Sequence, residues 1–435
     1  MEKKVCDLLL TGDVLDVSYE IRRDQAIAVT EGKITEVGAL EKMEKRYQCQ
    51  RKIDRRGMLW MPGLTDGHMH TGQQLLRGKI LDELPMIWTR IMLPFESTLT
   101  PAKMRLSADL AALEMVTSGT TSFVEAGSYF MESAAEAYEQ SGLRGALSCS
   151  TMDASNLPDS IRMNYQEAIA RTDALYEQLD GNGRMKVFYS LRSLLSCSEK
   201  LIALAAERAQ EKGTFLQAHM NEYTNEVQFF LEKYQKRPIA FLAERGYIGE
   251  RTLFAHCLFT SEEEIEIMAE NDVKVIHCPF SNCGKAVPNT PAMLKRNISV
   301  GFGTDGTAHG GMSLFNEMKI FRSVMNVHHG VALSQPDIMP AKQILQMALE
   351  GGAVAAGEEG NCGKIEAGYC ADVICVNTKR PHLFPTNNVV NTIVESVNAG
   401  DIEDMIVGGT VLMEKREVKT IDQEAVLYEA QKLFG

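Results

Sequence analysis

Histidines and other polar residues stand at the ends of several predicted strands in this chain of 435 residues. The first is the pair His68-Met69-His70, and residues two apart in extended backbone point to the same side. Two imidazoles on one side can share a divalent cation at about 2.0–2.1 Å. Later strand ends carry Arg192, His219 with Glu222 beyond it, His256, His277 and Asp305. Such a repeated placement favours one shared site over separate core histidines.

The elements that position these residues alternate between strand and helix. The predicted strands are Leu59–Leu64, Thr121–Glu125, Gly145–Cys149, Lys186–Ser190, Thr214–Ala218, Thr252–Ala255, Val273–Ile276 and Ser299–Gly303. Helices are predicted at Pro101–Ser118, Met131–Ser141, Ser198–Lys212 and Ser261–Glu270. This alternation is typical of parallel βαβ units, and eight of them predict an α/β fold, a (β/α)8 TIM barrel. Barrel enzymes carry their chemistry at the carboxyl ends of the strands, where the polar residues lie.

Both ends of the chain have a different, β-rich texture. Short apolar runs broken by glycines and charges occupy residues 1–58, and similar runs return in residues 361–435 before a helix predicted at Asp422–Phe434. We therefore expect a small β-sandwich domain built from both termini, with the barrel in residues 59–360.

Composition excludes several classes of protein. Apolar residues make up 45 % and charged residues 24 %, as in ordinary globular chains. The net charge of −13 and the absence of basic runs argue against nucleic acid as a partner. No segment predicts a membrane span or a secretory signal, and the ten scattered cysteines are typical of reduced thiols. We expect a cytoplasmic protein with no membrane partner; homo-oligomer formation is left open.

Several motifs together resemble the amidohydrolase superfamily, in particular its cyclic-aminohydrolase branch of adenosylhomocysteine/methylthioadenosine deaminases and triazine hydrolases. The matching segments, in chain order, are Pro62–His70, His219-Met220-Asn221-Glu222, Ala255-His256-Cys257, Ile276–Asn282, Gly303-Thr304-Asp305-Gly306 and Gly363–Gly368 with Ala371-Asp372-Val373. Each motif alone is weak, but the ordered set spans nearly the whole chain. The resemblance implies a hydrolase that acts on carbon–nitrogen bonds other than peptide bonds.

The resemblance also implies a role for each residue. The metal ligands would be His68, His70, His219 and Asp305. Glu222 would carry a proton to the ring nitrogen and the leaving amine, His256 would orient the attacked group, and Asp305 would accept the proton of the attacking water. Because no lysine ends a predicted strand as a bridging ligand would, one divalent metal is expected: zinc, with iron or manganese as alternatives.

Further residues are predicted to contact a small N-heterocyclic substrate. Pro94-Phe95-Glu96 matches the stretch with which the branch's nucleoside deaminases grip ribose hydroxyls. Arg192 replaces the histidine that those enzymes carry after strand four, and it suits a carbonyl or carboxylate oxygen. This favours an oxo-substituted amino-heterocycle over plain adenosine. Trp88 as an apolar wall, His309 in a glycine loop and Asn282 complete the predicted substrate contacts.

Each functional interpretation has an alternative. Glu222 could cap a helix at Thr224–Tyr234, His309 could merely line the rim, and His277 is expected as a hydrogen-bond partner behind the ligands in preference to being a ligand itself. The leading function is metal-dependent hydrolytic deamination of a purine, pterin, pyrimidine or nucleoside. Hydrolysis of another C–N or a C–Cl bond, as in a chlorohydrolase or cyclic amide hydrolase, is the second. A non-catalytic scaffold is the third, and the four candidate ligands argue against it.

Overall fold

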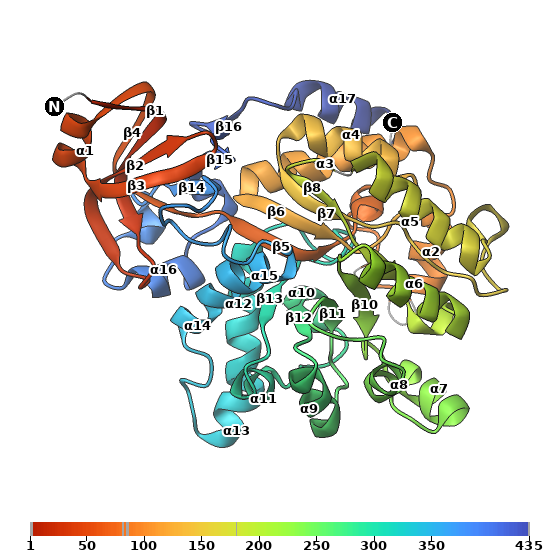
Figure 1. Ribbon diagram of the computed structural model, residues 1–435. Coiled ribbons are helices and arrows are strands. Elements are labelled where there is room, and N and C mark those ends of the chain that lie inside the picture. The colour runs from red at the N-terminus through yellow and green to blue at the C-terminus, as the bar shows by residue number, and fades with distance from the viewer. Residues whose placement is uncertain (1–2, 81, 84–86, 180, 434–435) are drawn as a thin grey trace.

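Two parallel sheets form the centre of the molecule in the computed structural model, which describes residues 3–80, 82–83, 87–179 and 181–433 (Figure 1). The first sheet contains β5 (Leu64–Met69), β6 (Thr120–Glu125), β7 (Arg144–Leu147) and β8 (Met185–Val187). The second contains β9 (Tyr189–Leu191), β10 (Leu216–Met220), β11 (Thr252–His256), β12 (Lys274–His277) and β13 (Val300–Phe302). In both sheets the strand order follows the chain, as βαβ units require.

The two sheets meet at both edges. At one edge, Met69 at the end of β5 forms a parallel bridge with Asp305, whose amide donates to the carbonyl of His68 at 2.9 Å. At the other edge, β8 runs almost directly into β9, and the amide of Phe188 between them donates to Leu147 at 2.9 Å. Parallel strands that meet at both edges are consistent with a TIM barrel.

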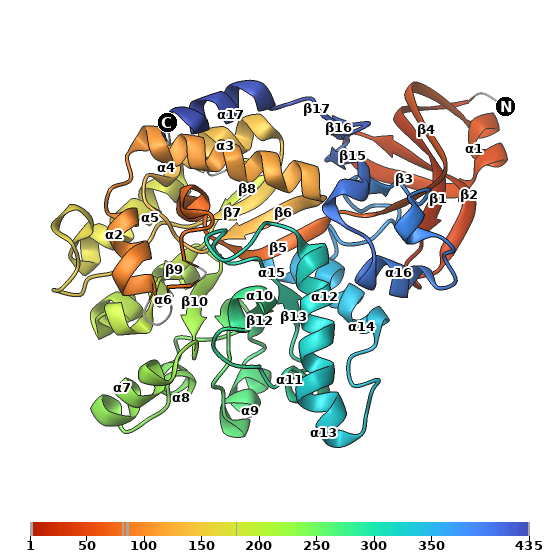
Figure 2. The ribbon, with the colours of Figure 1, turned by 180° about the vertical axis from the view of Figure 1, so that it is seen from behind.

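Helices surround these strands, and their ends follow the capping residues. The α-helices are α1 (Leu40–Arg46), α2 (Leu93–Glu96), α3 (Pro101–Ser118), α4 (Met131–Ser141), α5 (Tyr165–Leu179), α6 (Glu199–Glu211), α7 (Thr224–Tyr234), α8 (Pro238–Glu244), α9 (Glu262–Glu270), α10 (Pro279–Asn282), α11 (Thr290–Lys295), α12 (Leu314–Met325), α13 (Val331–Leu333), α14 (Ala341–Gln346), α15 (Gly352–Ala355), α16 (Val389–Glu395) and α17 (Gln423–Lys432). Thr100 caps α3, which ends at Gly119 in the left-handed conformation. The helices predicted at α3, α4, α6 and α9 are confirmed. At the C-terminus α17 lies along α3 (Figure 2), and Phe434 of its predicted range lies outside the described residues.

Two strand predictions are wrong in their limits. Leu59–Pro62 is the end of a long strand in a different sheet, where Leu59 pairs with Val376, and the first strand of the parallel sheets starts at Leu64. An uninterrupted apolar run hid this boundary, which falls at Gly63. The strand predicted at Lys186–Ser190 is in fact two short strands, β8 and β9, in separate sheets.

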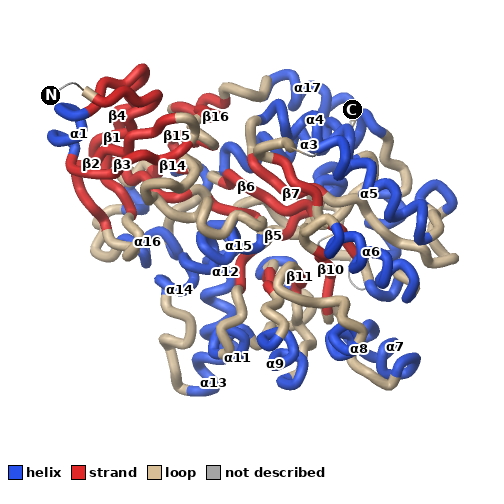
Figure 3. Tube along the Cα trace, in the orientation of Figure 1, coloured by secondary structure: helices blue, strands red, loops and turns tan. Residues whose placement is uncertain are grey.

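Strands from both ends of the chain build one mixed eight-stranded sheet beside the parallel strands (Figures 1 and 3). Its members are β1 (Lys4–Leu15), β2 (Ile21–Thr30), β3 (Lys33–Ala39), β4 (Tyr47–Pro62), β14 (Val373–Val376), β15 (Ile402–Val407), β16 (Thr410–Glu414) and β17 (Glu417–Val418). The order is β17-β16-β15-β14-β4-β1-β2-β3, so β4 and β14 join the two ends.

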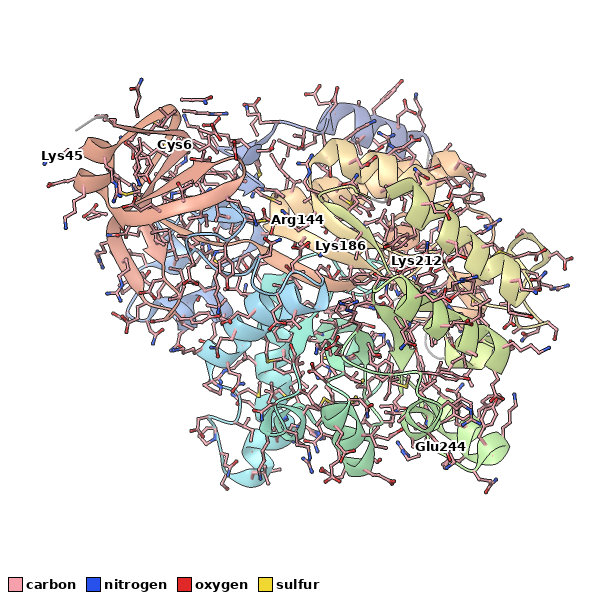
Figure 4. The ribbon with its side chains drawn as sticks, in the orientation of Figure 1. Cys6, Lys45, Arg144, Lys186, Lys212 and Glu244 are labelled. Atoms are coloured by element: carbon pink, nitrogen blue, oxygen red, sulfur yellow. The ribbon has the colours of Figure 1, made fainter. Side chains whose placement is uncertain are left out.

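A buried ion pair ties this sheet to the parallel strands. Arg144 at the start of β7 donates from Nε to Asp372 Oδ2 at 2.8 Å, next to β14, and Figure 4 labels Arg144 at this junction. All ten cysteines are free thiols. Among the described helices, none has the length and apolar character needed to span a bilayer.

Candidate active site

Four side chains from strand ends converge on one point. His68 lies on β5 and His70 follows it, His219 lies on β10, and Asp305 comes shortly after β13. Their ligand atoms all lie within 4.8 Å of one another, and all four residues are buried. We call these four residues the His/Asp cluster.

The distances within the His/Asp cluster suit a shared cation. His70 Nε2 lies 3.1 Å from His219 Nε2 and 3.2 Å from Asp305 Oδ1, and His68 Nε2 lies 3.9 Å from the same oxygen. Nε2 of His68 is buried with no hydrogen-bond partner among the described residues. A buried nitrogen without a partner is costly, and a metal ion would satisfy it. The residues present therefore fit one divalent ion.

The charge states of the cluster also fit a ligand role. Burial lowers the pKa of the His68 and His219 imidazoles well below the usual value, so both are neutral and their lone pairs are available. Burial alone would raise the pKa of the Asp305 carboxyl. The hydrogen bond to His70 and the charges of His256 and Lys285 outweigh it and hold that pKa well below its usual range. A carboxylate beside imidazole nitrogens is a typical zinc ligand set.

The backbone around the cluster is built for close approach. A Cβ atom on Gly303 would lie 2.6 Å from the carbonyl oxygen of His68, so only glycine lets β13 approach β5 here. Asp66 accepts from the amides of His68 at 3.2 Å and Thr304 at 3.0 Å, which fixes the two strand ends together. Asp305 itself has a φ of +58°, a conformation that costs energy and gathers at functional sites.

Glu222 and His256 lie beside the cluster. His256 Nε2 is 3.8 Å from Glu222 Oε1, and both residues form a second group with Asp305 whose ligand atoms lie within 4.8 Å. Burial would raise the pKa of Glu222, but the nearby Lys285 ammonium and His256 lower it below its usual value. Glu222 does not cap α7, whose N-cap is Tyr223 without a side-chain hydrogen bond.

Two residues support His256 from behind. Asn282 Oδ1 lies 3.0 Å from His256 Nδ1, and His277 Nδ1 lies 3.0 Å from the His256 carbonyl oxygen. His277 is fully buried and is not a member of the His/Asp cluster. Asn282 is not among the described residues that line the cavity, and its contact with the substrate stays a prediction.

A cavity of about 320 Å³ opens onto the cluster. Trp88, Arg192, Glu222 and His309 line it, together with His70, His219 and Asp305. Arg192 Nη1 lies 2.8 Å from His70 Nδ1, and its Nη2 donates to Glu96 Oε1 at 2.9 Å. Glu96 is buried behind Arg192, and its second oxygen, Oε2, has no hydrogen-bond partner among the described residues.

The sequence did not predict three further residues at this site. Gln73 donates to Glu96 Oε1 at 2.9 Å, Lys285 lies 2.5 Å from Glu222 Oε1, and Ser281 donates to Asp305 Oδ2 at 2.6 Å. Gln73 and Ser281 lie on short helical turns and Lys285 lies in a loop. The alternation of side chains along a strand therefore could not identify them. Ser281 was within reach of sequence reasoning, because it belongs to the motif Ile276–Asn282.

Comparisons with known proteins agree with this geometry. A 5'-deoxyadenosine deaminase of Methanosarcina mazei is 34% identical over 410 residues, which cover 93% of this chain and 92% of the relative. A 5-methylthioadenosine/S-adenosylhomocysteine deaminase of Caldanaerobacter subterraneus is 34% identical over 386 residues, covering 87% of each chain.

Solved structures show the same architecture. A zinc-bound adenosine deaminase from Xanthomonas campestris superposes with a TM-score of 0.93 at 26% identity and covers 99% of this chain and 98% of its own.

The model of the amidohydrolase family matches residues 59–412, well over half of the chain. The chain therefore belongs to the amidohydrolase family.

Proposed function

We propose that the protein is a metal-dependent hydrolytic deaminase that replaces the amino group of an N-heterocycle with oxygen and releases ammonia. One observation carries this proposal: His70, His219, Asp305 and Glu222 line a single cavity, and the buried His68 and His256 lie against them. A water activated by the metal, the Glu222 carboxyl and the His256 imidazole would then lie within reach of one substrate atom. The relatives, which are named deaminases, support the same reaction.

We propose one divalent ion, zinc, on His68, His70, His219 and Asp305, with iron or manganese as alternatives. When bound, such an ion lowers the pKa of a coordinated water from 15.7 to about 7. Zinc is supported by the imidazole and carboxylate ligand set and by the zinc-bound neighbour.

The protein's own groups would then move the protons. Glu222 takes the first proton of the attacking water and delivers it to the ring nitrogen. Asp305 accepts the second proton of that water as the new C=O bond forms, and Glu222 carries it on to the departing amine, which leaves as ammonia. His256 donates a hydrogen bond to the oxygen that attacks the ring carbon. General acid–base help of this kind contributes typically about 10²–10⁴-fold. Asn282 holds the His256 ring through Nδ1, and His277 holds the backbone of His256 through its carbonyl oxygen.

Two substrate classes follow from the cavity. Arg192 presents charged donors, which suit an oxygen acceptor on the substrate ring, and we propose an oxo-substituted amino-heterocycle on that ground. Glu96 favours the second class, adenosine-type nucleosides, because Pro94-Phe95-Glu96 matches the stretch with which nucleoside deaminases grip ribose hydroxyls, and its Oε2 has no hydrogen-bond partner among the described residues. The names of the relatives also favour that class. Trp88 and His309 would bound the substrate in either case.

The alternative is hydrolysis of another C–N bond or of a C–Cl bond on the same scaffold. Glu222 argues for amine release, because ammonia needs a proton on departure and chloride does not. A non-catalytic scaffold is disfavoured because all four candidate ligands lie together.

We further propose that the parallel strands close into a (β/α)8 barrel, and that residues 1–58 and 361–435 form a small β-sandwich domain beside it. The hydrogen bonds at both sheet edges support closure. Because β4 runs to Pro62 in the mixed sheet, we place the start of the barrel unit at Gly63, and not at residue 59.

Ammonia release across aminopurines, pterins, pyrimidines, triazines, 5'-deoxyadenosine and 5-methylthioadenosine tests the function. We expect turnover of at least one amino-heterocycle by the zinc-loaded protein and its loss in Asp305→Asn. Release of chloride from a chlorotriazine without ammonia from any amine would contradict the proposal, as would full activity in Asp305→Asn.

A further inference from the structure

Lys285 is a buried lysine in the loop between α10 and α11, at the wall of the cavity. Its side chain is only 4% exposed. Lysines are almost never fully buried without a partner, because an ammonium loses its hydration when it leaves water. A buried ammonium at this place therefore needs acceptors, and the site supplies them.

The two acceptors are Glu222, a proposed proton-transfer group, and Ser281, which contacts the other such group, Asp305. Lys285 Nζ donates to Glu222 Oε1 at 2.5 Å and to Ser281 Oγ at 2.8 Å. Ser281 Oγ in turn donates to Asp305 Oδ2 at 2.6 Å. One chain of hydrogen bonds thus runs from Glu222 through Lys285 and Ser281 to Asp305.

This chain fixes the orientation of the Glu222 carboxylate. Lys285 holds Oε1, whereas no described residue donates a hydrogen bond to Oε2, and Glu222 lines the cavity. The centroid of the Tyr223 ring lies 5.5 Å from Nζ, within the range of a cation–π contact. A glutamate side chain has several torsions, and a charge-assisted hydrogen bond is the strong kind that holds one orientation.

We propose that Lys285 is a positioning residue that holds Glu222 in the orientation for proton delivery and, through Ser281, holds Asp305 in register with it. Lys285 keeps its three protons throughout and acts only through these neighbours. This inference rests on the proposed deaminase function.

Steady-state kinetics on the zinc-loaded enzyme test it. In Lys285→Met we expect kcat to fall about 10²-fold while KM changes less than about threefold, because misplacement of a catalytic group by 1 Å costs about that much. Lys285→Arg should recover most of the loss, because it keeps a charged donor. Lys295→Met, an exposed lysine in the last turn of α11, is the matched control and should keep the wild-type rate.

A double-mutant cycle separates positioning from a general effect of charge. In the Glu222→Gln background, Lys285→Met should cost less than about threefold, because the group that it positions no longer delivers a proton. Metal content should stay at one equivalent in every variant. Undiminished kcat in Lys285→Met, or the same loss in both backgrounds, would overturn the proposal.

A structural measurement keeps the two proposals distinguishable. If wild-type protein releases no ammonia from any amine, the proposed function fails, and crystal structures of zinc-loaded wild type and Lys285→Met still test the lysine. We expect one Glu222 conformer in the wild type and several in the variant. The same single conformer in both would overturn the role of Lys285. If Lys285→Met does not fold, Ser281→Ala serves in its place, with Asp305 as the group to compare.

Discussion

Arg192 is the residue on which substrate choice depends most in this site. Its guanidinium lies between the His70 ring and Glu96 and lines the cavity. We expect Arg192→Ala to change the ratio of kcat/KM for oxo-substituted against plain aminopurines by at least about tenfold, since a hydrogen bond to a charged group is worth roughly 1.5–3 kcal/mol. Ammonia release on matched substrate pairs measures this ratio.

The control for that substitution is Arg162→Ala, an exposed arginine that should leave the ratio unchanged. Metal content of Arg192→Ala, measured by elemental analysis, should stay at the wild-type level because the guanidinium is not a ligand. Loss of the metal from Arg192→Ala would show that its position against His70 serves the cluster and not the substrate.

Among the single residues of the site, the sequence predicted those at the ends of strands and missed those on irregular segments. His68, His70, His219 and Asp305 could be named because parallel strands bring their carboxyl ends to one place. The contact of Asn282 with His256 could not, because it depends on how a four-residue helix packs. The side-chain torsions of Lys285 were equally out of reach.

Helix α7 carries a buried acid, Glu226, whose ionisation makes the free energy of unfolding depend on pH. Glu226 accepts from the amide of Asn221 at 2.7 Å, and burial raises its pKa to about 8. The folded protein therefore binds more protons than the unfolded chain between pH 4.5, the ordinary value, and about 8. Stability from this group is present below that window and is lost as the pH rises through it.

Glu226→Gln removes this titration and can still accept from Asn221. We expect the loss of unfolding free energy between about pH 5 and pH 8 to be smaller in Glu226→Gln than in wild type, as measured by guanidinium unfolding. Glu232→Gln, an exposed glutamate on the same helix, should follow the wild-type curve. An equal pH dependence in Glu226→Gln and wild type would contradict the assignment.

Elements with local signals were predictable and elements with long-range partners were not. α3 has its N-cap at Thr100, a proline at its first position and a left-handed Gly119 at its end, all visible in the sequence. The division between β4 and β5 has no such mark. Leu59–Pro62 is apolar, and it is buried as the following strand is, so that only its pairing with β14 assigns it to the mixed sheet.

The whole molecule joins segments that lie far apart in the chain. Arg55 on β4 binds Asp404 on β15 through two hydrogen bonds of 2.6 Å, and this buried ion pair adds to the pairing of β4 with β14. The β-rich texture of both ends predicted that they would meet. The register of β4 against β14 was not predictable, because the paired residues, such as Leu59 and Val376, lie more than 300 residues apart.

The His/Asp cluster also joins residues that lie far apart in the chain. Anomalous diffraction at the zinc edge tests this cluster most directly. Crystals grown with zinc should show one anomalous peak, about 2.0–2.2 Å from nitrogens of His68, His70 and His219 and from an oxygen of Asp305. A peak elsewhere, or no peak among these four side chains, would contradict the account.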